Sequence, residues 1–300
     1  PDSLSNELND QVWAALQSAG NQPDTPLGRL ISPLSSAEGA DYLLYAQAFR
    51  GVEYLYFLTP GQPLPCELAD LNDAELDTCQ REQRGQQWVS TGFDELTADG
   101  IRAAVLEGAL KISRARNLIR LSQRASYEDS SLTMDFLVQR DGESEFQRSD
   151  ESTMERLSVG SRIRIDLKNQ DPRKAMRAHL FFIGSDMKIA YAKVITLSPG
   201  EDASYISPAL NAKSTGREFF LVLAEPADNQ SVTHRFSHLK QDGLLVHKGE
   251  LVDMENRPYR GGPSLTSLLL HATGLYDDPT RGQTDGEETI RLFGWETLAD

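Results

Sequence analysis

Two features are scarce in this sequence: it has two cysteines and no run of about 18 apolar residues that could cross a membrane. The first thirty residues also lack the basic and apolar blocks of a secretory signal peptide. We therefore expect no insertion into a membrane. Because the chain opens with Pro1 instead of methionine, we expect it to be either a trimmed chain or the downstream part of a longer polypeptide, and the compartment, cytoplasmic or periplasmic, stays open.

The two cysteines, Cys66 and Cys79, lie in a polar segment that contains prolines and has no histidine nearby. This spacing matches no zinc site. In an oxidising compartment the pair can form a local disulfide, whereas in a reducing one we expect two separate thiols. Both alternatives remain open at the level of sequence.

Negative charge dominates, with 45 acidic against 30 basic residues and a net charge of −15. Acidic chains repel phosphate backbones unless basic residues gather on one face. The densest basic stretch falls in a helical segment, where we expect the side chains to form a solvated face, and we expect no nucleic-acid partner. Its members are Lys111, Arg114, Arg116, Arg120 and Arg124.

Recognisable catalytic motifs are missing from the sequence. It has no Walker loop, no GxGxxG dinucleotide fingerprint and no GxSxG elbow, and neither cysteine lies in a glycine-rich or serine-rich turn. His234 and His238 are four residues apart, but their segment lacks the glutamate of the zinc protease pattern. We therefore assign no catalytic, cofactor-binding or metal-binding residue and expect no cofactor.

A chain of 300 residues with 39% hydrophobic residues is long enough for two folded units. The first half alternates helical and extended patterns. The helical spacing of apolar residues is clearest over 99–123, and an acidic polar stretch over 60–87 indicates a loop or short helix. The sequence predicts helices at 5–19 and 99–123 and strands at 40–49 and 52–60.

The second half changes to a period of two. The segment 159–170 is the clearest strand, because Ile163, Ile165 and Leu167 alternate with charged residues. Short strands joined by turns, without helices between them, favour an antiparallel immunoglobulin-like β-sandwich. Further strands are predicted at 132–140, 177–195 as a hairpin, and 217–226, with a charged linker or long loop at 140–156 and a short helix at 261–274.

The predicted fold class is thus α+β, a mixed helix and strand unit followed by the sandwich. We place the mixed unit at 1–125, closed by its long helix, and the β-sandwich at 126–250. Residues 251–300 are expected to form a C-terminal helix and tail that pack on the rest.

Four tyrosines on the first predicted strand pair are candidates for contact with a partner: Tyr42, Tyr45, Tyr54 and Tyr56. Alternate residues of a strand point to opposite faces, so some of these rings should leave a core that covers one face only. Tyrosine is also enriched in interfaces. The alternative is that the rings pack beneath the helix at 99–123.

The order of these features resembles the region downstream of the protease domain in prokaryotic caspase-like peptidases of the metacaspase and orthocaspase type. The resemblance rests on LKISRARNLIRLS, VGSRIRIDLKNQ, HLFFIGSDMKI and GREFFLVLAEP, and it spans residues 95–245. The last part resembles a β-rich domain of unknown function that recurs in that family. The family's catalytic histidine and cysteine lie in the protease domain, so no catalytic residue carries over to this chain.

The resemblance implies a non-catalytic accessory region that binds a protein partner or regulates a caspase-like protease in the same or a co-encoded polypeptide. Two alternatives remain. The first is an exported binding protein of the cell envelope, in which a Cys66 to Cys79 bridge would be expected. The second is a hydrolase with an unrecognised site, which a screen with peptidase and glycosidase substrates would detect.

Overall fold

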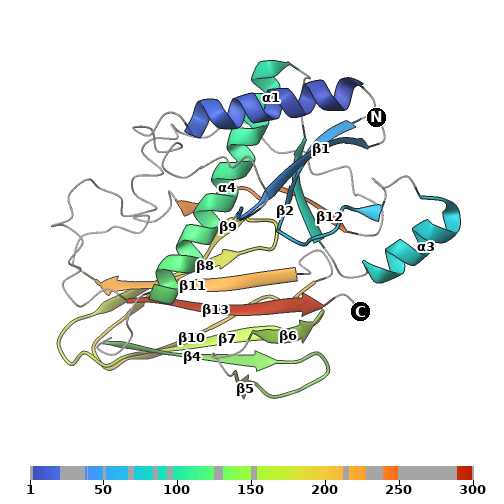
Figure 1. The fold of residues 1–300 in the computed structure, drawn as a ribbon. Helices are drawn as coiled ribbons and strands as arrows, with labels where there is room; N and C mark the ends of the chain where they lie inside the picture. The colour runs from blue at the N-terminus through green and yellow to red at the C-terminus, as the bar shows by residue number, and fades with distance from the viewer. Residues whose placement is uncertain are drawn as a thin grey trace. The chain divides into compact units, whose positions relative to one another are not determined.

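The computed structural model describes most of the chain in separate stretches and divides it into two compact units (Figure 1). Unit 1 comprises residues 1–113 and 243–266, and unit 2 comprises residues 114–242 and 267–300. The described residues are 3–20, 38, 40–49, 52–66, 71–83, 87–92, 97–124, 131–149, 154–211, 216–227, 239–248 and 289–298. The chain is strand-rich α+β with mostly antiparallel sheets, which confirms the predicted class at that level.

Unit 1 contains one four-stranded antiparallel sheet with the order β1-β2-β3-β12. The helix α1 contacts β1, and the long helix α4 begins in this unit. The elements are α1 (Ser3–Gly20), β1 (Leu43–Phe49), β2 (Val52–Leu58), α3 (Asp73–Glu82), β3 (Gln87–Gly92), α4 (Ala98–Arg124) and β12 (Leu245–Lys248). The predicted helices and strands of this region are therefore present, and the polar segment 60–87 contains a short helix.

Side chains cover both faces of β2 in unit 1. Tyr54, Tyr56 and Trp88 pack together on one face. On the other face Phe57 reaches α4 so closely that a Cβ added to Gly108 would lie 2.2 Å from its ring. A glycine at that position lets the helix approach the strand. The strand is buried on both faces because its alternate side chains meet different residues, the Trp88 cluster on one face and α4 on the other.

Unit 2 contains two sheets. The first has the order β10-β7-β4-β5 and is antiparallel throughout, and the second has the order β6-β13-β11-β8-β9 with one parallel pair, β13 and β6. The strands are β4 (Leu132–Gln139), β5 (Gln147–Arg148), β6 (Glu155–Ser158), β7 (Arg162–Asn169), β8 (Met176–Ile183), β9 (Ile189–Leu197), β10 (Asp202–Ile206), β11 (Gly216–Pro226) and β13 (Thr289–Leu298).

The two sheets of unit 2 share one hydrophobic core. Phe136 of β4 stacks on Phe293 of β13 with ring centroids 4.8 Å apart, which joins the sheets directly. Trp295 is fully buried beside Phe293, and its indole N–H donates to the buried carboxylate of Glu218 at 3.1 Å. The predicted alternation of β7 is confirmed, since Ile163, Ile165 and Leu167 are buried in this core.

The second sheet also buries its other face. Phe181, Ile183 and Leu221 form a separate cluster there, and Ala115 and Leu118 from the C-terminal half of α4 pack into it. The central strands β8 and β11 are therefore apolar on both sides, which explains why their sequences read as continuous hydrophobic runs instead of an alternating pattern.

Three sequence predictions need correction. The stretch 140–156 is not a linker, because β5 and the start of β6 lie in it and both strands join sheets of unit 2. β12 pairs with β3 in unit 1, so the predicted boundary of the sandwich at 250 does not match the units. Within 251–300, residues 289–298 form a central strand instead of a tail, and the predicted helix at 261–274 lies outside the described residues.

The basic stretch of α4 is not uniformly solvated. Arg120 is exposed, as expected for the outer face of the helix. Arg114 is 6% exposed, and burial lowers the pKa of its guanidinium. The expected solvated face is therefore interrupted at Arg114. Helical periodicity missed this residue because a long arginine is compatible with either face of an amphipathic helix.

Candidate functional site

The outer edge of β10 is the site that offers the most direct binding chemistry. β10 ends its sheet and pairs only with β7 among the described strands. Two backbone hydrogen bonds at the ends of β10 show which of its residues bond to β7. Asn169 N–H donates to Glu201 O at 3.0 Å, and Ser207 N–H donates to Ile163 O at 2.8 Å. Because bonded and non-bonded pairs alternate in an antiparallel ladder, Ala203 bonds toward β7 and its neighbours point away.

The outward backbone groups are those of Asp202, Ser204 and Ile206, and their side chains are also exposed. Ile206 is 49% exposed, which is unusual for a large apolar residue in this structure. Ala203 and Tyr205 instead pack against the core, and the Tyr205 ring meets Phe220 edge-on at 5.8 Å. Burial raises the pKa of Tyr205. The inner residues therefore hold β10 in place while the outer row faces solvent.

The other edges of unit 2 are less suited to pairing. β5 has two residues and β6 has four. β9 contains a register shift opposite Leu180 and Phe181, carries the exposed Lys193, and exchanges backbone bonds with Gln241 at Ile189. Bulges, lysines and short length are the features by which proteins protect sheet edges from pairing. β10 has no lysine, arginine or proline within its length.

A buried polar chain crosses three strands of the second sheet. The Tyr191 hydroxyl is hydrogen-bonded to Nδ1 of His179, and Nε2 of His179 lies 3.1 Å from Oε1 of Glu225. With the phenol as donor, His179 is neutral and donates its Nε2 hydrogen to the carboxylate. Arg177 lies 4.0 Å from the same carboxylate oxygen. The register shift in β9 aligns Tyr191 with Phe181, on the same face as His179.

The hydrogen-bonded series of Tyr191, His179 and Glu225 has the order hydroxyl, imidazole and carboxylate that a catalytic triad uses. Its electrostatics, however, disfavour a nucleophilic phenol. Burial, followed by the charge of Glu225, raises the pKa of Tyr191 to about 12, and Arg177 offsets part of this effect. The hydroxyl therefore stays protonated at neutral pH and acts as a hydrogen-bond donor. His179 is fully buried. The arrangement satisfies the polar groups of a packed histidine, as expected for a histidine in a strand.

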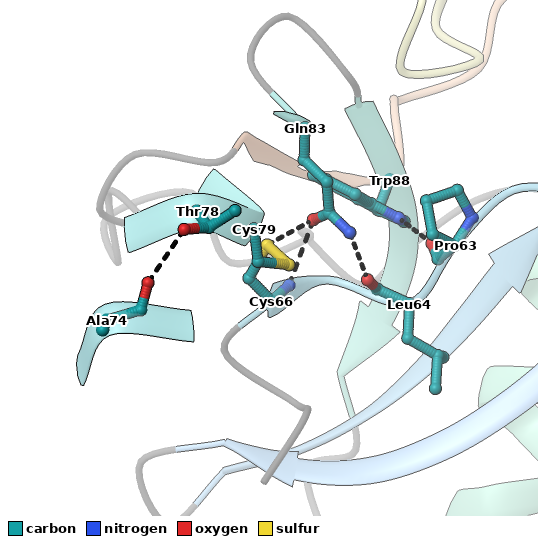
Figure 2. Close-up of a disulfide and its surroundings, with 8 residues drawn as sticks. All are labelled: Pro63, Leu64, Cys66, Ala74, Thr78, Cys79, Gln83 and Trp88. Atoms are coloured by element: carbon teal, nitrogen blue, oxygen red, sulfur yellow. Dashed lines mark hydrogen bonds between the residues drawn. A yellow bond between two sulfur atoms is a disulfide. The ribbon is translucent and has the colours of Figure 1, made fainter. Parts of the chain in front are cut away.

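A disulfide links Cys66 and Cys79 within unit 1 (Figure 2). Gln83 holds the surrounding chain, because its Oε1 accepts from the Cys66 N–H at 3.1 Å and its Nε2 donates to Leu64 O at 2.8 Å. The Trp88 indole N–H donates to Pro63 O at 2.9 Å. The structure thus adopts the first of the two alternatives for these cysteines.

The disulfide attaches α3 to the segment that follows β2. α3 begins with a capping box, in which Asn72 Oδ1 accepts from the N–H groups of Ala74 and Glu75 and Glu75 Oε2 accepts from the Asn72 N–H at 3.0 Å. The helix is mostly polar and offers few side chains for burial. Cys79 within the helix and Gln83 directly after it are therefore the main described links from this segment to the rest of unit 1.

The prediction that four tyrosines are candidates for contact with a partner is wrong for two of them. Tyr54 and Tyr56 are 5% and 2% exposed, so neither ring is available to a partner. Tyr45 is half-buried against the same cluster, and Tyr42 is half-buried. The expectation was wrong for β2 because both faces of this strand are covered, whereas the alternation argument assumed a core on one face only.

The remaining sequence candidates add no site. His234 and His238 lie outside the described residues. Within the described stretches, no group of three histidine, cysteine or acidic side chains is placed to hold a metal ion. None of the described helices combines the length and apolar character needed to cross a membrane. β10 itself was missed by sequence reasoning, although Ala203 and Tyr205 alternate with outward residues after a Pro199 and Gly200 turn.

Comparisons with known proteins leave the family open. No family model matches the chain, and no curated protein matches it. Among solved structures, it is similar to an alkylpurine DNA glycosylase, AlkC from Pseudomonas fluorescens, bound to DNA containing an abasic site analog. The identity is 13%, the match covers 54% of this chain and 43% of that chain, and the TM-score is 0.20. A likeness at that TM-score supports no inference about the fold or function of this chain.

Proposed function

We propose that this chain is a non-catalytic accessory region that binds a protein partner by adding a strand of that partner to β10. The observation that carries the proposal is the outward row of backbone groups at Asp202, Ser204 and Ile206. Strand addition uses such groups for affinity and alternate side chains for specificity. The partner that fits the sequence resemblance is a caspase-like peptidase in the same or a co-encoded polypeptide.

For unit 2, the same proposal includes an immunoglobulin-like sandwich as the scaffold. Two sheets that share a core, with Phe136 stacked on Phe293 between them, support this description. A non-catalytic role is supported by the Tyr191 phenol, which resembles a nucleophile in its contacts but keeps its proton at neutral pH. An exposed sheet edge is one of the recurring sites at which proteins bind an extended segment of a partner.

A second candidate, an exported envelope binding protein, is favoured by the disulfide between Cys66 and Cys79. Structural disulfides persist in oxidising compartments and are rare in reducing ones. Binding through β10 is compatible with either location. A count of free thiols on protein isolated from its native compartment separates a cytoplasmic accessory region from an exported one.

Replacing Ser204 with proline is expected to weaken binding to the caspase-like peptidase by about fivefold, because proline removes one outward N–H donor and about 1 kcal/mol of hydrogen bonding with it. Edge strands tolerate proline where the N–H faces solvent. The ladder to β7 uses the neighbouring residues and should remain. The measurement is the Kd from titration calorimetry.

The matched control is Ser204→Ala, which keeps the backbone N–H and removes only the hydroxyl that donates to Asp166 at 2.6 Å. Both variants should retain the far-UV circular dichroism of the parent chain. Equal affinity of the proline and alanine variants for the peptidase would reject strand addition at β10.

A further inference from the structure

The chemistry along the outer edge of β10 specifies what kind of strand can pair there, if the proposed function holds. In an antiparallel pair, residues opposite each other have Cβ atoms about 5 Å apart on the same face of the sheet. Asp202 and Ile206 are both exposed on the outer face, at opposite ends of the strand. A partner strand must therefore satisfy a carboxylate at one end and an apolar side chain at the other.

The Asp202 end of β10 is acidic. Asp202 lies beside Glu201, whose carboxylate accepts the Ser198 N–H at 2.7 Å, and this bond lowers the pKa of Glu201. Lys168 is the described cation opposite Asp202, at 3.5 Å, and both side chains are more than half exposed. Such an exposed pair contributes little and leaves the carboxylate accessible. A basic residue on an added strand would lie beside Asp202 on the side of β10 that faces away from β7.

The Ile206 end of β10 is apolar and marks where pairing stops. Ile206 is 49% exposed and lies opposite Arg164, whose guanidinium is held by Asp166 at 2.7 Å. An apolar side chain placed against Ile206 would remove this surface from water. Pro208 follows two residues later and offers no N–H to a ladder. The paired stretch therefore runs from Asp202 to Ile206.

We infer that β10 binds an antiparallel segment of another protein that carries an apolar residue opposite Ile206 and, four residues later, a basic residue opposite Asp202. Antiparallel pairing matches the rest of this sheet. A second copy of this chain fits less well. Pairing β10 with itself about Ser204 would set each Asp202 against an Ile206 of the other copy.

The inference is tested with two blocked peptides, Gly-Ile-Thr-Thr-Thr-Lys-Gly and the same peptide with glutamate in place of lysine. Binding is followed by NMR titration of the backbone amides of Asp202, Ser204 and Ile206. The lysine peptide should bind the parent chain about threefold more tightly than the glutamate peptide, as expected for a cross-strand charge pair. Asp202→Lys should reverse this preference.

The outcomes of the peptide titration separate the inference from the proposed function. If both peptides bind equally and Ser204→Pro weakens the binding of both, strand addition stands and the chemistry inferred for the partner is wrong. If neither peptide shifts the β10 amides, the inference about the partner strand is also wrong. The proposed function is then decided separately, by the calorimetric titration with the peptidase. Concentration-dependent broadening of the same amides without peptide would assign the edge to a second copy and overturn the inference.

Discussion

Replacing Phe136 with alanine is expected to lower the free energy of unfolding of unit 2 by about 3–5 kcal/mol, the cost of emptying a large aromatic site in a packed core. Phe136 is 1% exposed and stacks on Phe293, so its removal opens a cavity between the two sheets. The measurement is amide hydrogen exchange of β4 and β7, whose slowest amides report unfolding of this unit.

The matched control for this substitution is Phe146→Ala. Phe146 is half-buried beside β5, where its ring lies 5.2 Å from the Arg164 guanidinium carbon. Loss of that partly exposed contact should cost about 1 kcal/mol or less. If both substitutions reduce protection of β4 and β7 equally, Phe136 does not join two sheets in a common core.

Removing the disulfide by Cys66→Ala and Cys79→Ala is expected to destabilise unit 1 by about 3 kcal/mol, the chain-entropy estimate for a closed loop of this length. Gln83 should then lose its fixed position, because it bonds the Cys66 N–H and Leu64 O around the bridge. The loss is measured by hydrogen exchange of β2 and β3 together with the α3 amides.

A reductant provides the control for the disulfide. Dithiothreitol should reproduce the loss in the parent chain and leave the double alanine variant unchanged, and the amides of unit 2 should keep their protection in both. Protection in β2, β3 and α3 that is insensitive to reductant would contradict a stabilising role of the bridge. Two free thiols in protein isolated from its native compartment would contradict the bond itself.

Sequence patterns were sufficient where one face of an element is buried and the other is wet. β7 is the clearest example, because Ile163, Ile165 and Leu167 alternate with charged residues and the structure buries all three. α4 was predicted from apolar residues at helical spacing. This spacing continues along the whole helix, although the boundary between the two units falls within it, between Ser113 and Arg114. Local periodicity carries this information without knowledge of the neighbours.

Pairing between distant segments was beyond the reach of local patterns. β6 has one fully buried apolar residue, Leu157, in a charged tract, which is too few positions to establish a period. Its strand character depends on parallel pairing with β13, more than a hundred residues away. Burial of Glu218 likewise depends on donors from Trp295 and Thr297 on the opposite strand.

The candidate site was missed for a related reason. β10 consists of five residues, and its two inward side chains, Ala203 and Tyr205, form a very short apolar pattern. Its importance as an edge depends on sheet order, which no local pattern contains. The tyrosines of β2 were misjudged in the same way. Tyr54 and Tyr56 are buried by residues distant in sequence, among them Trp88 of β3 and Leu64 in the segment that leads to Cys66.

Amide hydrogen exchange of β10, measured with and without the caspase-like peptidase, tests strand addition most directly. In the chain alone, the Asp202, Ser204 and Ile206 amides should exchange fast and those of Ala203 and Tyr205 slowly, because only the latter bond to β7. We expect the peptidase to slow exchange at the first three positions by about tenfold or more. Unchanged exchange at those three amides in a saturated complex would contradict binding through β10.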